Sequence, residues 1–192
     1  MKKFVITSIS ILALSATSAS ASEIFSDIST ANGLPKVSSE AAENLETCMS
    51  STDGSSKSIR ACSKALKTVV PNYAIKSNIY TQRGLLKLSA GRYDAASKDF
   101  KSAAKLNKEN EFAYLGEGFA SIMQEDYSTA LDYFSDCQNH KKTAPLAVYG
   151  RAIAKELTGD TRGAYADFRQ AADMRPDWAA PRDELKRFKI PS

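Results

Sequence analysis

The sequence repeats its own pattern every 34 residues. The segment 91–107 reads GRYDAASKDFKSAAKLN, and the same skeleton returns at 125–141 and at 159–175. Equivalent positions carry alanine (Ala96, Ala130, Ala164) and phenylalanine (Phe100, Phe134, Phe168). A fixed period of this length is typical of stacked supersecondary units that bury their apolar faces against one another. The repeat therefore predicts a solenoid built from similar units.

Each copy spaces its apolar residues as a helix does, and no long stretch alternates apolar with polar residues. We therefore predict an all-α chain made of helix pairs. The expected parts are a degenerate helical pair at 40–76, three clear repeats at 77–110, 111–144 and 145–178, and a capping helix with a tail at 179–192. The closing helix is expected from Asp177 to Phe188, with Asp177 as its N-cap.

The first 21 residues have the pattern of a secretory signal peptide. Lys2 and Lys3 precede a short apolar run, and Ala19-Ser20-Ala21 forms a small-residue cleavage site. We expect cleavage after Ala21, a periplasmic or secreted protein, and a flexible arm at 22–39. An uncleaved N-terminal anchor is the alternative, although the apolar run is short for a membrane span, and no other stretch has the length to span a bilayer.

Three cysteines in an exported chain make a disulfide plausible. Cys48 and Cys62 flank a turn-forming segment between two helical patterns, and we predict that they pair. Cys137 takes the position at which the other copies carry alanine, so we interpret it as a small buried hydrophobe. A redox-active pair is the sharper alternative, but Cys48 and Cys62 lack the usual two-residue spacing.

The residues that enzymes and metal sites require are sparse. His140 is the single histidine, and no second pair of ligands with suitable spacing accompanies Cys137 and His140. Aspartates such as Asp99 and Asp167 lie among lysines and serines, and we interpret them as residues of solvated helical faces. No phosphate-binding or nucleophile motif is present. We predict a non-enzymatic protein without cofactor or metal.

The helix pairs resemble tetratricopeptide repeats. The resemblance rests on the alanine and phenylalanine ladder, on aromatic residues at Tyr80 and Tyr114, on small residues four positions later, and on Pro176 at the end of the last copy. Those small residues are Gly84, Gly118 and Ala152. It implies a right-handed solenoid in which the small residue lets the two helices of a pair approach closely. It also implies a protein or peptide partner. Nucleic acid is not expected as a partner, because the signal-peptide pattern predicts an exported protein.

In this family the first helix of each pair lines a concave groove. The residues that the resemblance turns inward are mostly apolar and include Leu85, Met123 and Leu157. The partner-binding residues that we predict are Phe112, Leu115, Phe119, Ile122, Tyr149 and Ile153. The Lys, Arg and Asn set that grips a peptide carboxylate in such repeats is missing, which favours an apolar or helical peptide. Alternatively, curvature buries these residues, or the arm with Ile24, Phe25 and Ile28 fills the groove.

A lysine stripe recurs on the second helices, which in this family face the convex side. It includes Lys64, Lys67, Lys98, Lys101, Lys105 and Lys108. Cleavage at Ala21 removes Lys2 and Lys3, which lowers the formal net charge from +4 to +2, so overall charge indicates no special partner. The stripe is compatible with a solvated face, or with a structural subunit that uses this face in an envelope assembly. Oligomeric state cannot be inferred from these patterns.

Overall fold

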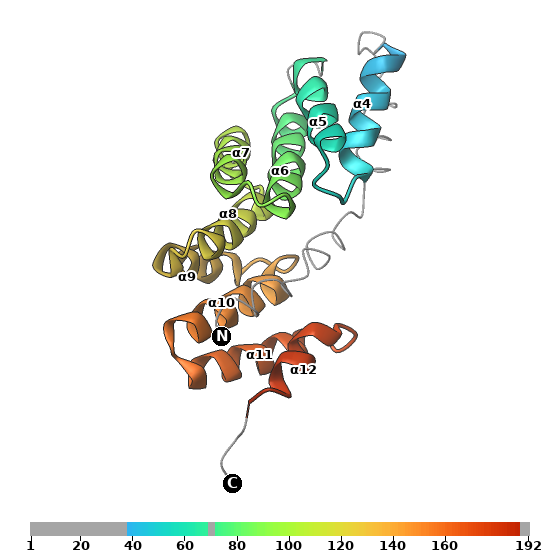
Figure 1. The fold of residues 1–192 in the computed structure, drawn as a ribbon. Helices are drawn as coiled ribbons and strands as arrows, with labels where there is room; N and C mark the ends of the chain where they lie inside the picture. The colour runs from blue at the N-terminus through green and yellow to red at the C-terminus, as the bar shows by residue number, and fades with distance from the viewer. Residues whose placement is uncertain (1–37, 69–71, 189–192) are drawn as a thin grey trace.

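The computed structural model describes residues 38–68 and 72–188, and within these ranges the chain forms nine helices and no strand (Figure 1). The predicted signal peptide and nearly all of the predicted arm lie outside the described residues. The helices are α4 (Ser39–Ser50), α5 (Ser56–Thr68), α6 (Tyr73–Ser89), α7 (Tyr93–Leu106), α8 (Glu111–Met123), α9 (Tyr127–Cys137), α10 (Ala144–Thr158), α11 (Thr161–Met174) and α12 (Ala179–Leu185). The predicted all-α class is confirmed.

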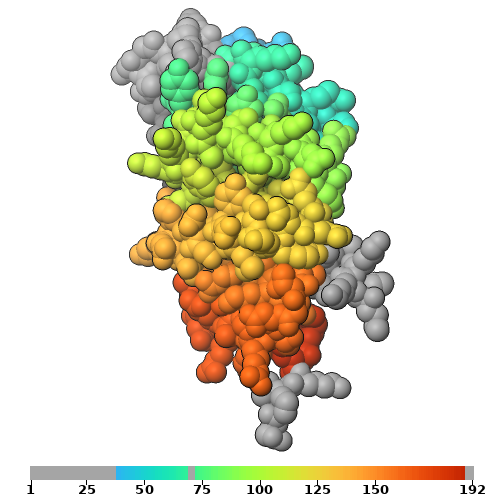
Figure 2. Space-filling view, turned by 90° about the vertical axis from the view of Figure 1, so that its left-hand side faces the viewer, coloured from blue at the N-terminus to red at the C-terminus, as the bar shows by residue number. Residues whose placement is uncertain are grey.

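Consecutive helices pack as pairs, and the pairs stack in chain order along the molecule (Figures 1 and 2). The first helices of successive pairs, α4, α6, α8 and α10, also contact one another. The second helices, α5, α7, α9 and α11, make no comparably extensive contacts among themselves in the described part. We call the side on which the first helices meet the inner face, and the side of the second helices the outer face.

Two phenylalanine rings hold successive pairs together. Phe100 of α7 lies against Gly84 of its own pair and Gly116 of the next, and Phe134 of α9 repeats this with Gly118 and Gly150. A Cβ at Gly84 would lie 2.6 Å from the Phe100 ring, and one at Gly118 would lie 2.7 Å from the Phe134 ring. The glycines thus make room for a ring that bridges two pairs, rather than only for a neighbouring alanine.

The closing helix is shorter than predicted. It begins at Ala179 with Trp178 as N-cap residue, not with Asp177, and its last residue is Leu185. No side chain caps its first turn, whereas Asn110, Asp126 and Asp160 accept backbone N–H groups at the starts of α8, α9 and α11. The indole of Trp178 is instead packed on Tyr149, with ring centroids 4.8 Å apart, so tertiary packing determines where α12 begins.

The predicted disulfide between Cys48 and Cys62 is present and joins α4 to α5. Both cysteines are fully buried in a small apolar cluster with Leu45, Ile59 and Ile79, which is separate from the main core. This pair is the first among the described helices, so it packs against a described neighbour on one side only. The cross-link therefore compensates for the small core at this end. In the described residues no helix combines the length and apolar character needed to cross a membrane.

Reduction of the disulfide should loosen this end of the array selectively. Closing a loop of this size contributes about 3 kcal/mol in the chain-entropy model. We expect dithiothreitol to accelerate amide hydrogen exchange strongly in α4 and α5 while exchange in α10 and α11 changes little. A Cys48→Ala/Cys62→Ala variant should behave like the reduced protein. Equal acceleration in all helices would contradict a separately stabilised terminal pair.

The turns inside the three repeats share one left-handed backbone conformation. Gly91 has φ 73°, Gly159 has φ 94°, and Glu125, at the equivalent position of the middle repeat, has φ 63°. The side chain of Glu125 makes this conformation unfavourable, since only glycine adopts it without a steric cost. The middle turn therefore carries backbone strain that the flanking turns lack.

Replacing Glu125 should relieve this strain. We expect Glu125→Gly to raise the free energy of unfolding by about 0.5–1 kcal/mol, measured by urea denaturation. Gly159→Ala is the matched control, because a Cβ at Gly159 would meet no atom within 4 Å. It should lower the free energy of unfolding by about 1 kcal/mol through backbone strain alone. A destabilised Glu125→Gly protein would refute this account of the middle turn.

Candidate protein-interaction surface

The structure buries most of the residues that we predicted to contact a partner. Phe112 keeps partial exposure. The exposed fractions of the other five are 0% for Leu115, 3% for Phe119, 0% for Ile122, 5% for Tyr149 and 2% for Ile153. All five belong to the main apolar core. An exposed contact surface on the inner face has to come from other residues of the same helices.

Ring packing shows why these positions are covered. The Phe119 ring meets the Phe134 ring edge-on, with centroids 5.0 Å apart, so it points toward α9. Tyr149 lies between Phe168, at 5.5 Å, and Trp178, at 4.8 Å. Helical spacing alone does not reveal that neighbouring helices and the segment before α12 cover these side chains.

A set of partly buried apolar side chains remains on the helices that form the inner face. Its members belong to the first helices or directly precede α12, and all pack against the main core: Leu85, Phe112, Met123, Leu157 and Trp178. We call this set the inner apolar row. Met123 and Leu157 occupy equivalent positions of adjacent repeats. Sequence analysis missed Trp178, although its position two residues beyond the closing Pro176 was a usable signal.

The inner face changes character along the array. At its beginning Asn110 Nδ2 donates to Ser77 Oγ at 2.8 Å and to Thr81 Oγ1 at 3.0 Å, all within buried residues. Two repeats further on, the positions equivalent to Thr81 and Asn110 are Tyr149 and Trp178. A hydrogen-bonded polar pair at one end is thus replaced by an aromatic pair at the other.

The aromatic end is bordered by charge. The Arg175 guanidinium lies 5.3 Å from the centre of the Trp178 ring. Arg187 is paired with Glu156 at 3.1 Å and also donates to Glu184. Burial, reinforced by the nearby Glu184, raises the pKa of the Tyr149 hydroxyl well above its usual range. Tyr149 is therefore a neutral packing residue at physiological pH.

Two aspartates that we predicted to be solvated are in fact buried. Asp99 accepts from Arg83 Nε at 2.8 Å and Nη2 at 2.7 Å, and Lys87 Nζ lies 2.6 Å away. Asp167 repeats the arrangement with Arg151 and Lys155, each at 2.8 Å. Their exposed fractions are 3% and 5%. The cations come from the first helix of each pair, so periodicity within the second helix could not reveal this burial.

In the middle repeat an acidic side chain takes the place of the arginine that pairs with the buried aspartate. Glu117 replaces the arginine, and its Oε1 accepts from Ser97 Oγ at 2.7 Å and pairs with Lys101 Nζ at 3.1 Å. Its Oε2 is buried with no hydrogen-bond partner among the described residues. In each of the three repeats a buried carboxylate, Asp99, Glu117 or Asp167, pairs with a cation from a neighbouring helix, and the pair stabilises helix packing.

Cys137 lies in the core, and His140 lies at the surface beside Glu111. The thiol of Cys137 is buried, as predicted, and burial raises its pKa to about 12. His140 is half exposed, with Nδ1 3.5 Å from Glu111 Oε1. Within the described ranges no three His, Cys, Asp or Glu side chains gather in a way that could hold a metal ion.

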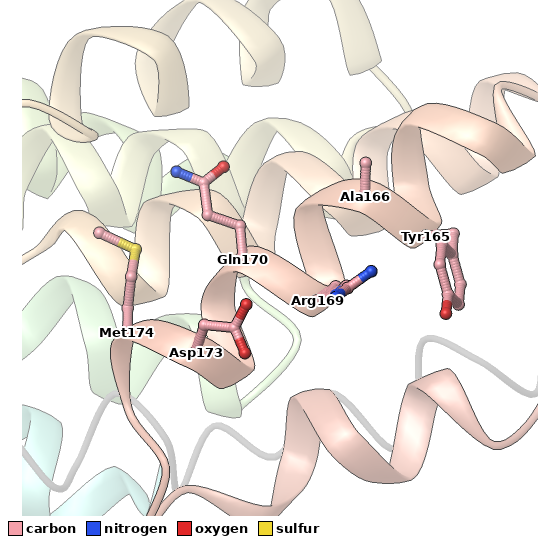
Figure 3. A pocket seen from close by; sticks show the side chains of 6 residues that line it. All are labelled: Tyr165, Ala166, Arg169, Gln170, Asp173 and Met174. Atoms are coloured by element: carbon pink, nitrogen blue, oxygen red, sulfur yellow. The ribbon is translucent and has the colours of Figure 1, made fainter.

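A shallow depression of about 490 Å³ lies on the C-terminal repeat. Its lining side chains, from Tyr165 to Met174, all project from α11 (Figure 3). Arg169, Gln170 and Asp173 supply polar groups and Met174 an exposed apolar one. One helix face does not enclose a substrate, so this region offers contact area rather than a reaction site.

Solved structures share this arrangement of helix pairs. YrrB, described as a TPR protein with an unusual peptide-binding site, superposes with a TM-score of 0.57 at 17% identity, covering 68% of this chain and 65% of YrrB. The fold is that of the tetratricopeptide repeat. MamA (41-end) from Desulfovibrio magneticus RS-1 gives a TM-score of 0.62 at 15% identity, covering 78% of this TPR chain and 83% of MamA. No protein-family model and no curated protein matches the sequence.

The Cys137 thiol should be inert in the folded TPR array. Because its pKa is raised to about 12, almost no thiolate exists at pH 8, and the side chain is also inaccessible. We expect Ellman's reagent to leave the native protein unmodified and to titrate one thiol after unfolding in urea without reductant. Rapid labelling of the native protein would show that Cys137 is reactive and would overturn its assignment as a packing residue.

Proposed function

We propose that this chain is a non-catalytic interaction module of the bacterial cell envelope that holds an apolar or helical segment of a partner protein on its inner face. The observation that carries the proposal is the inner apolar row. Its side chains are anchored in the core yet keep part of their surface open. Rigid, partly exposed apolar groups are suited to binding because little side-chain freedom is lost on association.

The inner apolar row has the chemistry of a helix-in-groove contact. Leu85, Phe112, Met123 and Leu157 present aliphatic, aromatic and thioether surface without a charged group among them. Methionine adapts its shape to differently packed partners, and an aromatic ring contributes a large apolar area. An amphipathic partner helix would place its apolar stripe on such a row.

The fold supports an interaction role by analogy. YrrB carries a peptide-binding site on the same type of array, and the likeness to it is one of fold rather than of sequence. The function of a fold is decided by its surface groups, so this analogy supports the proposal without replacing the inner-row argument. The buried, paired carboxylates and the inert thiol also leave few side chains for catalysis.

The envelope location rests on the sequence and on the disulfide. The signal-peptide pattern of residues 1–21 directs export. The bond between Cys48 and Cys62 suits an oxidising compartment, because cytoplasmic thiols are normally kept reduced. Both features favour the periplasm or the exterior of the cell.

Site-specific photo-crosslinking tests the proposed inner contact. A benzophenone amino acid at Phe112 or Leu157 of the exported protein should yield crosslinks to partner protein in intact cell envelopes. The same amino acid at Met174, which is 42% exposed on α11, is the matched control and should yield few. Phe112→Arg combined with Leu157→Arg should reduce partner recovery at least about tenfold.

Several controls define how this experiment could fail. Circular dichroism of each variant should match that of the parent protein, since the substituted side chains are partly exposed. Crosslinks confined to Met174 would contradict the inner-face proposal. Equal recovery of partner with the Phe112→Arg/Leu157→Arg variant would do the same.

A further inference from the structure

A second surface lies on the outer face, away from the inner apolar row. Exposed cations stand on α5 and α7: Arg60, Lys64, Lys67, Lys98, Lys101 and Lys105. We call this set the basic ridge. Lys64 and Lys98 are equivalent in successive repeats, as are Lys67 and Lys101. The structure thus places the lysine stripe of the sequence on exposed positions and adds Arg60.

A side chain of the intervening helix α6 links the two helices of the ridge. Arg83 of α6 donates from Nη1 to Ser63 Oγ of α5 at 3.0 Å and from Nη2 to Asp99 Oδ1 of α7 at 2.7 Å. Ser63 and Asp99 directly precede and follow the ridge lysines Lys64 and Lys98 in sequence. This partly buried bridge therefore fixes the two rows of cations relative to each other.

Few anions within the protein balance these charges. Helix α5 contains no acidic residue, and Asp99 of α7 is buried against Arg83 and Lys87. The other aspartate of α7, Asp94, is exposed in the first turn, where it accepts from Gln124. Within residues 38–68 and 72–188, Lys64 pairs with Glu40 at 3.2 Å and Lys101 with Glu117 at 3.1 Å. Arg60, Lys67, Lys98 and Lys105 form no ion pair there.

The ridge has a defined end. The next second helix, α9, carries no lysine or arginine and exposes Asp132 and Asp136 instead. The outer face therefore changes from basic to acidic between α7 and α9. An anionic partner would be attracted to α5 and α7 and repelled at α9.

We propose that the basic ridge docks an acidic polypeptide segment of a partner protein. The cations of each row recur at helical spacing, i, i+4 and i+7 on α5 and i, i+3 and i+7 on α7. These intervals present charge every turn, which matches a chain bearing several Asp or Glu side chains. The inner apolar row and the ridge lie on different helices, so the two contacts are independent.

A polypeptide fits the ridge better than a bilayer does. The large apolar side chains exposed in the described part are Tyr73 and Met174, and neither lies on α5 or α7. The ridge therefore offers no apolar anchor for insertion at a membrane surface.

The test measures binding of the mature protein to a fluorescent peptide of alternating glutamate and alanine, by anisotropy. Lys64→Glu/Lys67→Glu and Lys98→Glu/Lys105→Glu should each weaken binding about tenfold or more. Lys141→Glu/Lys142→Glu, which reverses two exposed lysines between α9 and α10, is the matched control and should change affinity less than about twofold. Affinity should fall steeply between about 50 and about 300 mM salt.

Three outcomes would overturn the proposal. The first is a parent protein that does not bind the glutamate peptide above a glutamine–alanine peptide. The second is an equal loss of affinity in the ridge variants and in Lys141→Glu/Lys142→Glu, which would indicate that overall charge, rather than the ridge, determines binding. The third is ridge-dependent binding to phosphatidylglycerol vesicles without peptide binding, which would assign the ridge to lipid. Phe112→Arg/Leu157→Arg should leave binding of the glutamate peptide unchanged, so this assay tests the basic ridge independently of the inner-face proposal.

Discussion

The stacking of the helix pairs depends on phenylalanine rings that pack directly against glycine residues. Phe100 and Phe134 each contact a glycine of their own pair and a glycine of the next, so one side chain stabilises both the pair and the stack. The ring leaves no space for a Cβ at either glycine, and interiors packed this closely tolerate little change of volume. The approach of successive first helices, and with it the inner face, follows from these contacts.

Charge arrangement follows from the same stacking. Cations of the first helices reach buried aspartates of the second helices, and the Arg83 side chain also reaches Ser63 of the preceding pair. Because internal lysines and arginines neutralise the buried carboxylates, the cations of α5 and α7 are left facing solvent. The two proposed contacts therefore have different physical origins. The inner apolar row consists of core-packed side chains that keep part of their surface exposed, and the basic ridge consists of cations that few carboxylates neutralise.

Periodicity within the sequence predicted the helices and the order in which they pack. It predicted helices throughout, the stacking of pairs, the Cys48–Cys62 bond and the burial of Cys137. It did not predict which side chains the neighbouring helices cover. Asp99 and Asp167 are buried against cations of the first helix of their own pair. Five of the six expected contact residues are buried by neighbours that a single helical pattern does not specify. The start of α12 was misplaced for the same reason, since Trp178 is fixed by Tyr149.

The change along the inner face, from Thr81 and Asn110 to Tyr149 and Trp178, makes the three repeats chemically unequal although their backbones are alike. Thr81, Asn110 and Tyr149 are buried, so the difference lies beneath the inner face rather than on its surface. One end of the array is held by a few directional hydrogen bonds and the other by packed aromatic rings. A repeat moved to another place in the array would therefore meet neighbours of a different chemistry, and repeats with similar backbones are not interchangeable.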